Sequence, residues 1–273
     1  KAINLKKDFK EIYANFYRSK YCRVSLTDTE IKKFVNKKVL NYEDALLFSY
    51  LKGKLAGFIY EANIYQVVID EAQDYNKLQY IIIANIFQKA EFTILGDVNQ
   101  NINPYYKYDS LEELEDIFDN STKCLELLKT YRSSPEIINY TNKILNLHHV
   151  NAIRKETNLP IVFRKNVDLR KSLESDIYKL TKKYKSVAII TKDLTEANKI
   201  YKILNTFLPI SLIEESTTKF NKDLVVVPSY IAKGLEFDAV IVYNNRENSY
   251  RKDERNLLYV ACTRAQHELY IYN

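Results

Sequence analysis

Short runs of consecutive apolar residues, rich in Val and Ile, alternate along this chain with longer segments of helical periodicity. A strand made from such a run has no polar face, so it must be covered on both sides. Crossover helices supply that cover in parallel sheets. The pattern therefore predicts an α/β fold with parallel sheets. The predicted strands span residues 64–70, 92–97, 124–128, 160–164, 186–191, 224–228, 238–243 and 268–272, and the predicted helices span residues 76–88, 110–118, 134–147, 169–183, 193–205 and 253–264.

The predicted strands could form one large sheet, but we favour two smaller sheets that join near residues 128–131. Residues 1–60 are polar, basic and helical in pattern, and we place them in neither sheet. Charge is uneven: residues 1–60 carry a net +7, residues 61–120 carry −9 and the remainder carries +8, within a total of +6. The basic parts could face phosphate and the acidic part a metal, although charge alone is a weak indication of a polyanionic partner.

Scarce glycine and cysteine exclude several kinds of site. The chain has 4 glycines, and no segment matches G-x-G-x-x-G or G-x-x-x-x-G-K-[ST]. Cys22, Cys124 and Cys262 are scattered and form no C-x-x-C, so we predict neither a disulfide framework nor a zinc site. We expect a reducing, cytoplasmic compartment. No apolar run approaches the roughly 20 residues that span a bilayer, so we expect no membrane association.

Asp70 and Glu71 stand at the carboxyl end of the predicted strand 64–70, where ligands of open parallel sheets bind. Acidic residues there could simply begin a helix, because they interact favourably with a helix N-terminus. The arrangement also matches a Walker B site, in which the aspartate holds Mg²⁺ on a nucleotide and the glutamate activates the attacking water. Successive strand residues point to opposite faces, which disfavours a two-metal nuclease.

Five segments stand in series along the chain: VVIDEAQD (67–74), ILGDVNQ (94–100), LKTYRSSPEI (128–137), IAKGLEFDAVIV (231–242) and LLYVACTRA (257–265). They resemble the motifs of superfamily 1 helicases of the UvrD/Rep type, and both their order and their spacing fit. The strings YEDALLFSYLKGKLAG (42–57) and GDVNQNINPY (96–105) look most like the HelD branch, which comprises helicase-IV-like proteins, some of them associated with RNA polymerase. The resemblance covers residues 40–273 and implies two RecA-like lobes of the P-loop NTPase type, the first one partial.

For the first lobe, the resemblance implies that Asp70 binds Mg²⁺ and that Glu71 activates water. Gln100 resembles the glutamine that senses the γ-phosphate of ATP, and a neutral amide can donate to phosphate without repelling it. Tyr105 and Tyr106 follow this motif, where relatives place an aromatic residue that stacks on single-stranded bases. For these two tyrosines, ordinary packing is an equal alternative.

For the second lobe, the resemblance implies that Tyr131 stacks on adenine and that Arg132 and Arg264 contact the γ-phosphate. Glu236 resembles a carboxylate near the ribose, and Gly234 would allow close approach of the backbone. Alternatives stay open: Arg132 could cap a helix or pair with an acid, Arg264 lies near a helix end that favours a cation, and Tyr131 could belong to the core. His148 and His149 match no catalytic motif and are interpreted as a solvated helix end.

The family's glycine-rich Walker A loop, which holds the β and γ phosphates, is missing from this sequence. We therefore interpret the chain, which begins on Lys1 and contains no methionine, as a C-terminal fragment, and expect it to be inactive alone. Residues 1–60 would be a basic helical segment of the first lobe or its insertion. Residues 61–128 would complete that lobe and residues 129–273 would form the second.

The sequence thus predicts part of a bacterial ATP-dependent DNA helicase or translocase that uses ATP and Mg²⁺. Its expected partners are DNA, either single-stranded or a duplex with a single-stranded tail, the missing N-terminal part of the same protein and, through the HelD resemblance, RNA polymerase. One alternative is a non-hydrolysing module that binds nucleic acid or RNA polymerase. Another is a structural α/β domain whose acidic residues and arginines only form surface.

Overall fold

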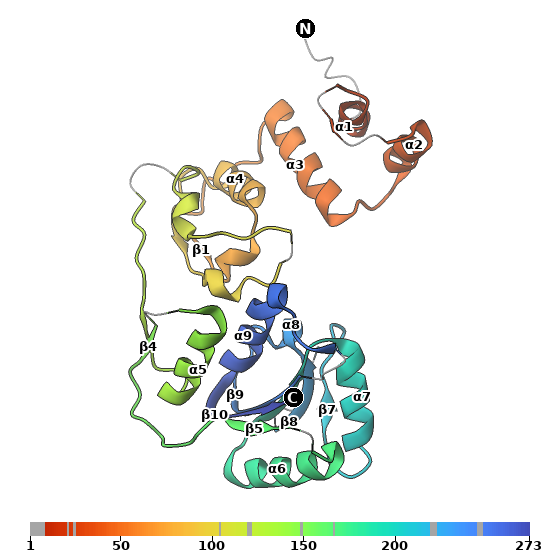
Figure 1. The fold of residues 1–273 in the computed structure, drawn as a ribbon. Helices are drawn as coiled ribbons and strands as arrows, with labels where there is room; N and C mark the ends of the chain where they lie inside the picture. Colours follow the sequence, from red (N-terminus) through yellow and green to blue (C-terminus); the bar gives the residue numbers. More distant parts are fainter. Residues whose placement is uncertain are drawn as a thin grey trace. The chain divides into compact units, whose positions relative to one another are not determined.

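The chain forms two compact units, one comprising Lys1–Asp97 with Tyr106–Cys124 and the other Val98–Tyr105 with Leu125–Asn273. Figure 1 shows the elements of each unit, coloured along the sequence. The assignment of residues 1–60, 61–128 and 129–273 to lobes of a helicase stays a prediction. The computed structural model describes residues 9–20, 22–23, 26–103, 105–118, 122–147, 150–165, 167–218, 223–244 and 248–273, so His148 and His149 lie outside it.

Three helices open the first unit, as the helical pattern within residues 1–60 predicts. A reciprocal cap begins the second of them: the Glu30 amide donates to the Thr27 hydroxyl (3.3 Å), and the Thr27 amide donates to the Glu30 carboxylate (2.8 Å). The helices are α1 (Phe9–Tyr17), α2 (Asp28–Asn36) and α3 (Tyr42–Ala56).

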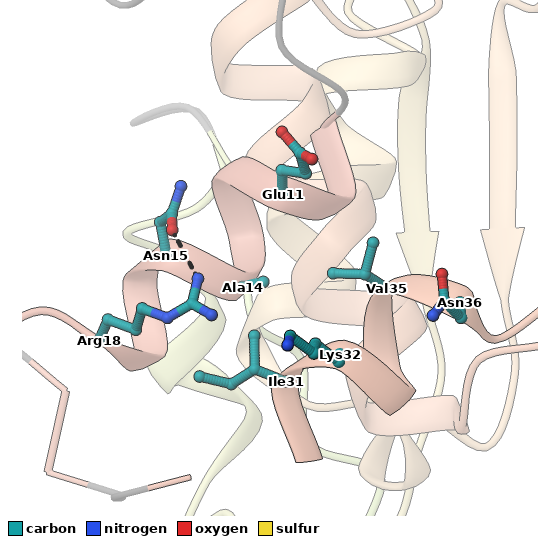
Figure 2. A pocket seen from close by; sticks show the side chains of 8 residues that line it. All are labelled: Glu11, Ala14, Asn15, Arg18, Ile31, Lys32, Val35 and Asn36. Carbon is teal, nitrogen blue, oxygen red and sulfur yellow. Dashed lines mark hydrogen bonds between the residues drawn. The ribbon is translucent and has the colours of Figure 1, made fainter. Parts of the chain in front are cut away.

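The first two helices pack through a small apolar cluster and leave a cavity between them. Tyr13, Ala14 and Ile31 are buried in that cluster. Figure 2 shows the cavity, of about 350 Å³, with Arg18 donating to the Asn15 side chain (3.0 Å) at its edge. Its lining mixes polar and apolar side chains: Glu11, Ala14, Asn15, Arg18, Ile31, Lys32, Val35 and Asn36.

The rest of the first unit is built on a parallel pair of strands joined by a helix. Strands β1 (Gln66–Ile69) and β2 (Glu91–Ile94) pair from Gln66 opposite Glu91 to Ile69 opposite Ile94. Helix α4 (Lys77–Ile86) connects them and begins at a capping box made by Asn76 and Gln79. Short 3₁₀ turns follow both strands: η1 (Ala72–Asp74), η2 (Val98–Gln100, in the second unit) and η3 (Leu111–Leu114).

The second unit holds a six-stranded sheet in the order β5-β10-β9-β6-β8-β7. Every strand pairing in the described residues is parallel, so the predicted α/β class with parallel sheets is confirmed. The strands are β5 (Val162–Arg164), β6 (Val187–Thr191), β7 (Ser211–Leu212), β8 (Leu224–Pro228), β9 (Phe237–Tyr243) and β10 (Ala265–Tyr272), and the helices are α5 (Pro135–Leu145), α6 (Leu169–Lys183), α7 (Leu194–Leu204), α8 (Ser229–Ala232) and α9 (Arg255–Thr263), with a 3₁₀ turn η5 (Lys252–Glu254) before α9.

Helices cover both faces of this sheet, as its continuous apolar strands predict. Along β6, Ala188 and Ile190 face one core and Val187 and Ile189 face the other. The first core includes side chains of α5, α8 and α9, and the second includes side chains of α6 and α7. In Figure 1, α6 and α7 accordingly lie on the opposite side of the sheet from α5 and α9.

Two predicted elements were wrong. Residues 124–128 were predicted as a strand, but pairing begins only with β3 (Lys129–Thr130), which pairs with β4 (Asn151–Ala152). Residues 110–118 were predicted as a helix, but only the η3 turn forms. Two acidic residues in this turn, Glu112 and Glu113, are followed directly by Glu115 and Asp116, and like charges so close together disfavour a continuous helix. The short elements β7 and α8 were not predicted. Within the described part of the chain, no helix has the length and apolar character needed to cross a membrane.

Candidate nucleotide site

The two acidic residues of the first unit lie in a tight turn directly after β1. The Asp70 carboxylate, which is exposed, accepts a hydrogen bond from the Glu71 amide (2.8 Å). Glu71 adopts the left-handed conformation, with φ 51° and ψ 42°. A non-glycine residue in this region is uncommon and costs free energy, and such residues cluster at functional sites. The turn therefore orients the Asp70 and Glu71 carboxylates differently from successive residues of a strand, which point to opposite faces of a sheet.

Gln73 fixes the Glu71 carboxylate. Its buried side chain donates to Glu71 Oε2 (2.6 Å) and accepts from the Asp97 amide (3.0 Å). It therefore joins the turn after β1 to the loop after β2. Gly96 permits this contact, because a Cβ at that position would lie 2.7 Å from Gln73 Oε1 and 2.9 Å from Ala72 Cβ.

Replacing Gly96 with alanine is expected to destabilise the chain by roughly 1–3 kcal/mol, because an added methyl group overpacks a tight contact. The methyl group must displace the Gln73 amide or the turn at Ala72. Urea denaturation of the 273-residue chain measures the change. An unfolding midpoint equal to that of the parent chain would show that this contact is loose.

A single exposed carboxylate is compatible with Mg²⁺ that arrives on a nucleotide. The described residues contain no group of three or more His, Cys, Asp and Glu side chains arranged to hold a metal. Nucleotide-bound Mg²⁺ needs only one or two protein carboxylates, because phosphate oxygens and waters complete its octahedral shell. Asp70 fits this requirement. Its assignment to Mg²⁺ stays a prediction.

The tyrosines that follow β2 differ in their surroundings. The Tyr106 hydroxyl donates to the carbonyl oxygen of Asp74, and its neighbour Tyr108 is buried and donates to the carbonyl oxygen of Tyr75 (2.7 Å). Tyr105 is almost fully exposed. Tyr105 thus offers an open ring face, whereas Tyr106 also serves the packing of the first unit. Base stacking by either residue stays a prediction.

In the second unit, Gln100 and Arg264 contact each other. Arg264 ends α9 and is only 1% exposed. Its Nη2 donates to Gln100 Oε1 (2.7 Å), and its Nε donates to the carbonyl oxygen of Val260 (3.1 Å). The neighbouring Asn256 side chain donates to the carbonyl oxygen of Asn99 (2.8 Å) and so holds η2 beside α9. The helix-end interpretation of Arg264 is therefore correct, but one edge of its guanidinium also meets the predicted phosphate-sensing amide.

Arg132 and Glu236 form a second pair in the same unit. Arg132 Nε lies 2.8 Å from Glu236 Oε1, and the Arg132 side chain is 43% exposed. The alternative that Arg132 pairs with an acid is thus observed, and the acid is itself a predicted site residue. The pairing of β9 with β10 sets Phe237 opposite Ala265, so Glu236 and Arg264 occupy adjacent positions at the start of these two strands.

Two further predicted site residues of this unit, Tyr131 and Gly234, lie close in the sequence to Arg132 and Glu236. Tyr131 is 79% exposed, so the alternative that it belongs to the core was wrong. Gly234 has φ 78°, a left-handed conformation that glycine adopts without strain, and a Cβ there would meet open space. Both observations are compatible with contact to a ligand. The stacking of Tyr131 on adenine and the close approach of the backbone at Gly234 stay predictions.

The structure gathers the predicted residues into two groups. Asp70 and Glu71 lie in the first unit, and the paired residues Gln100 with Arg264 and Arg132 with Glu236 lie in the second. Gln100 was predicted beside Asp70 and Glu71 in the first lobe, but its hydrogen bond with Arg264 holds it in the second unit. Convergence of the two groups on one ligand stays a prediction. Sequence reasoning missed several residues that support the second group. Ser133 and Ser134 lie inside a predicted motif, next to Arg132, and Gln266 and His267 directly follow another motif, whereas Arg154 lies outside every motif.

His267 is in direct contact with Arg154. Its ring stacks on Tyr184 (5.5 Å between ring centroids), and its Nδ1 lies 2.8 Å from Arg154 Nη2. A guanidinium can only donate, so Nδ1 accepts and the neutral ring carries its proton on Nε2. Burial, reinforced by the positive charge of Arg154, lowers the pKa of His267 from its usual 6.5.

Replacing Arg154 with glutamine is expected to raise the pKa of His267, because a positive charge beside the ring is removed. An NMR titration of the three histidines measures this, and an unchanged pKa would contradict the contact. In the parent chain the folded-state pKa lies below the unfolded value. The folded state therefore binds fewer protons, and the stability that neutral His267 contributes is present above pH 6.5 and declines as the pH falls.

The fold and the site together define a class: a two-unit α/β protein with parallel sheets, with acidic residues after a strand in one unit and paired arginines in the other. Residues 6–110 match the UvrD/REP helicase N-terminal domain, and residues 223–272 match the UvrD-like helicase C-terminal domain. These matches place the chain among UvrD/Rep-type helicases of superfamily 1. The N-terminal match includes residues 6–39, which the motif resemblance did not cover.

Individual relatives agree with the family match. The chain is 28% identical over 131 residues to a subunit of the ATP-dependent helicase/nuclease of Oenococcus oeni, across 44% of this chain and 11% of that protein. It is 31% identical over 86 residues to the ATP-dependent DNA helicase srs2 of Schizosaccharomyces pombe, across 30% of this chain and 10% of that protein. It therefore spans about a tenth of the length of these curated relatives.

A solved structure is also similar in sequence. This is the C-terminal domain of a possible DNA helicase from Lactobacillus plantarum WCFS1, which is 35% identical. The match covers 52% of this chain and 86% of that chain, with a TM-score of 0.44.

Proposed function

We propose that this chain is the C-terminal part of an ATP-dependent DNA helicase or translocase. One observation supports this most strongly: residues from four motifs that are far apart in the sequence pair within one unit, Gln100 with Arg264 and Arg132 with Glu236. A structural α/β domain has no need for two arginines and a glutamine around the amino ends of two neighbouring strands, β9 and β10. A γ-phosphate recognition site does need them, because guanidinium and amide groups neutralise and orient a transferring phosphoryl group.

In the complete enzyme, ATP·Mg²⁺ would bind between the two groups of residues. Asp70 would hold Mg²⁺, and Glu71, oriented by Gln73, would activate the attacking water. Arg132 and Arg264 would stabilise charge on the γ-phosphate, with Gln100 as its sensor. Tyr131 would stack on adenine, and Glu236 beside Gly234 would approach the ribose. Closure on ATP and opening after hydrolysis would then move the protein along a DNA strand.

We further assign the chain to the HelD branch, with RNA polymerase as a candidate partner. UvrD and Rep carry a large insertion domain between the segments that correspond to Arg132 and Lys233. Here the described residues between these positions all belong to the second unit. The compact connection favours the HelD resemblance. A pull-down tests this partner: the complete protein should bind RNA polymerase, and a truncated protein that lacks the 273 residues of this chain should not.

The 273-residue chain alone is expected to show no ATP hydrolysis above that of its Glu71→Gln variant. It contains no glycine-rich loop, and the backbone amides and lysine of such a loop supply most of the binding to the β and γ phosphates. A phosphate-release assay measures this. Robust hydrolysis by the parent chain that Glu71→Gln abolishes would contradict the expectation.

The complete gene product, read from the codons that precede Lys1, tests the proposed function. It is expected to hydrolyse ATP faster in the presence of single-stranded DNA and to displace a labelled strand from a tailed duplex. Binding of DNA or RNA polymerase with no hydrolysis by a folded protein would instead support the non-hydrolysing module.

A further inference from the structure

Arg154 links three parts of the second unit. It follows β4 and is half-buried. Its Nη1 donates to the carbonyl oxygens of Arg132 (2.8 Å) and Gln266 (3.0 Å), and its Nη2 lies against the His267 ring. One planar guanidinium therefore fixes the main chain on both sides of the site, at the Arg132 loop and at the start of β10. A lysine could not reproduce this, because its single nitrogen cannot bridge these acceptors in a rigid plane.

Gln266 binds Glu236, the ion-pair partner of Arg132. Its Nε2 donates to Glu236 Oε2 (2.7 Å), whereas Arg132 binds the other carboxylate oxygen. Its carbonyl oxygen also accepts from the Ser134 amide (3.0 Å). The contacts close a ring that runs from Arg132 to Glu236, to Gln266, to Arg154 and back to Arg132.

A second set of hydrogen bonds locks the same loop to the segment that follows Arg264. The buried Ser133 hydroxyl donates to the carbonyl oxygen of Ala265 (2.6 Å). The main chain after Arg132 is therefore attached to the main chain after Arg264. The two arginines predicted to act on one phosphate share a single hydrogen-bonded framework.

We infer that Arg154 and Gln266 are positioning residues, which hold the Arg132 side chain ready for its ligand. The inference rests on the proposed function, in which Arg132 contacts the γ-phosphate. An exposed arginine samples many rotamers, and ordering it when ATP binds would cost free energy. Glu236, held on its second oxygen by Gln266, restricts the Arg132 side chain, and Arg154 restricts its main chain. Preorganisation of this kind lowers the barrier for phosphoryl transfer.

The first experiment examines Arg132 itself in the 273-residue chain and needs no ATP. In the parent chain, the Nε–Hε signal of Arg132, assigned by its loss in Arg132→Lys, should be resolved and slow to exchange with water. It should broaden or exchange at least tenfold faster in both Arg154→Gln and Gln266→Ala. Lys155→Gln, an exposed neighbour of Arg154, is the matched control and should leave it unchanged. An unchanged Arg132 signal in the two test variants overturns the inference.

The second experiment measures coupling in the complete gene product. Arg154→Gln should lower kcat by roughly 10- to 100-fold, a range typical of a displaced catalytic group, with KM for ATP changed less than about twofold. In an Arg132→Ala background the same substitution should have no further effect, because it acts through Arg132. Equal losses in both backgrounds would overturn the inference. If the unsubstituted gene product has no ATPase activity, the proposed function fails, and the NMR result alone decides the positioning role.

Discussion

Replacing Arg132 with alanine will lower the rate of ATP hydrolysis by the complete gene product about a thousandfold and leave its fold intact. Arginines that stabilise the charge on a transferring phosphoryl group contribute factors of roughly 10³–10⁵ to the rate. The ion pair of Arg132 with Glu236 is solvent-accessible, so its loss costs at most about 1 kcal/mol of stability. Steady-state kcat and the thermal unfolding midpoint, measured on the same preparation, give both quantities.

Arg170→Ala is the matched control for this variant. Arg170 is an exposed arginine of α6 whose guanidinium lies over the Phe207 ring (5.1 Å), outside the predicted site. Its removal should change kcat by less than about twofold. If Arg132→Ala keeps more than a tenth of the parent rate, Arg132 does not act on the γ-phosphate.

Replacing Asp176 with alanine will lower the free energy of unfolding of the 273-residue chain by about 3 kcal/mol. Asp176, on α6, is buried and accepts from Arg164 Nε (2.8 Å), Arg164 Nη2 (2.9 Å) and the Tyr272 hydroxyl (2.6 Å). Burial opposes ionisation of Asp176, but the hydrogen bonds from Arg164 and Tyr272 lower its pKa overall. Removing it leaves a cation and a hydroxyl unpaired, which typically costs 3–5 kcal/mol; we expect the lower end because the Arg164 side chain is 32% exposed.

Glu174→Ala tests whether the loss is specific to this network. Glu174 is exposed on the same helix, so its removal should change the free energy of unfolding by about 0.5 kcal/mol or less. Denaturant titration with a constant m-value measures both variants. A loss below about 1 kcal/mol for Asp176→Ala would mean that the network is not a stabilising link between β5, α6 and β10.

The most regular elements could be predicted from the sequence with correct bounds. Residues 169–183 and 224–228 form α6 and β8 as predicted. In the first, Asp168 supplies a cap by accepting from the Lys171 amide, and in the second, five consecutive apolar residues are buried. Residues 124–128 failed because apolar character alone does not make a strand. Leu125 and Leu127 are exposed, and ladder pairing starts only at Lys129.

The site was only partly accessible to sequence reasoning. Motifs identified Arg132, Glu236 and Arg264, because each lies in a recognisable local string. The pairing of Gln100 with Arg264 joins residues that are 164 positions apart, and no local pattern encodes such a contact. Arg154 was missed for the same reason, since its acceptors lie 22 and 112 positions away. The left-handed Glu71 could not be predicted either, because Gln73, which donates to the Glu71 carboxylate, is itself held by the Asp97 amide, 24 positions further along the chain.

The central claim is that carboxylates of one unit and guanidinium groups of the other act on a single ATP. A crystal structure of the complete gene product with Mg²⁺ and a non-hydrolysable ATP analogue tests it most directly. We expect Asp70 to bind the metal ion or one of its waters, with Arg132 and Arg264 both within hydrogen-bond distance of the γ-phosphate. An analogue bound with these arginines distant from its phosphates would contradict the claim.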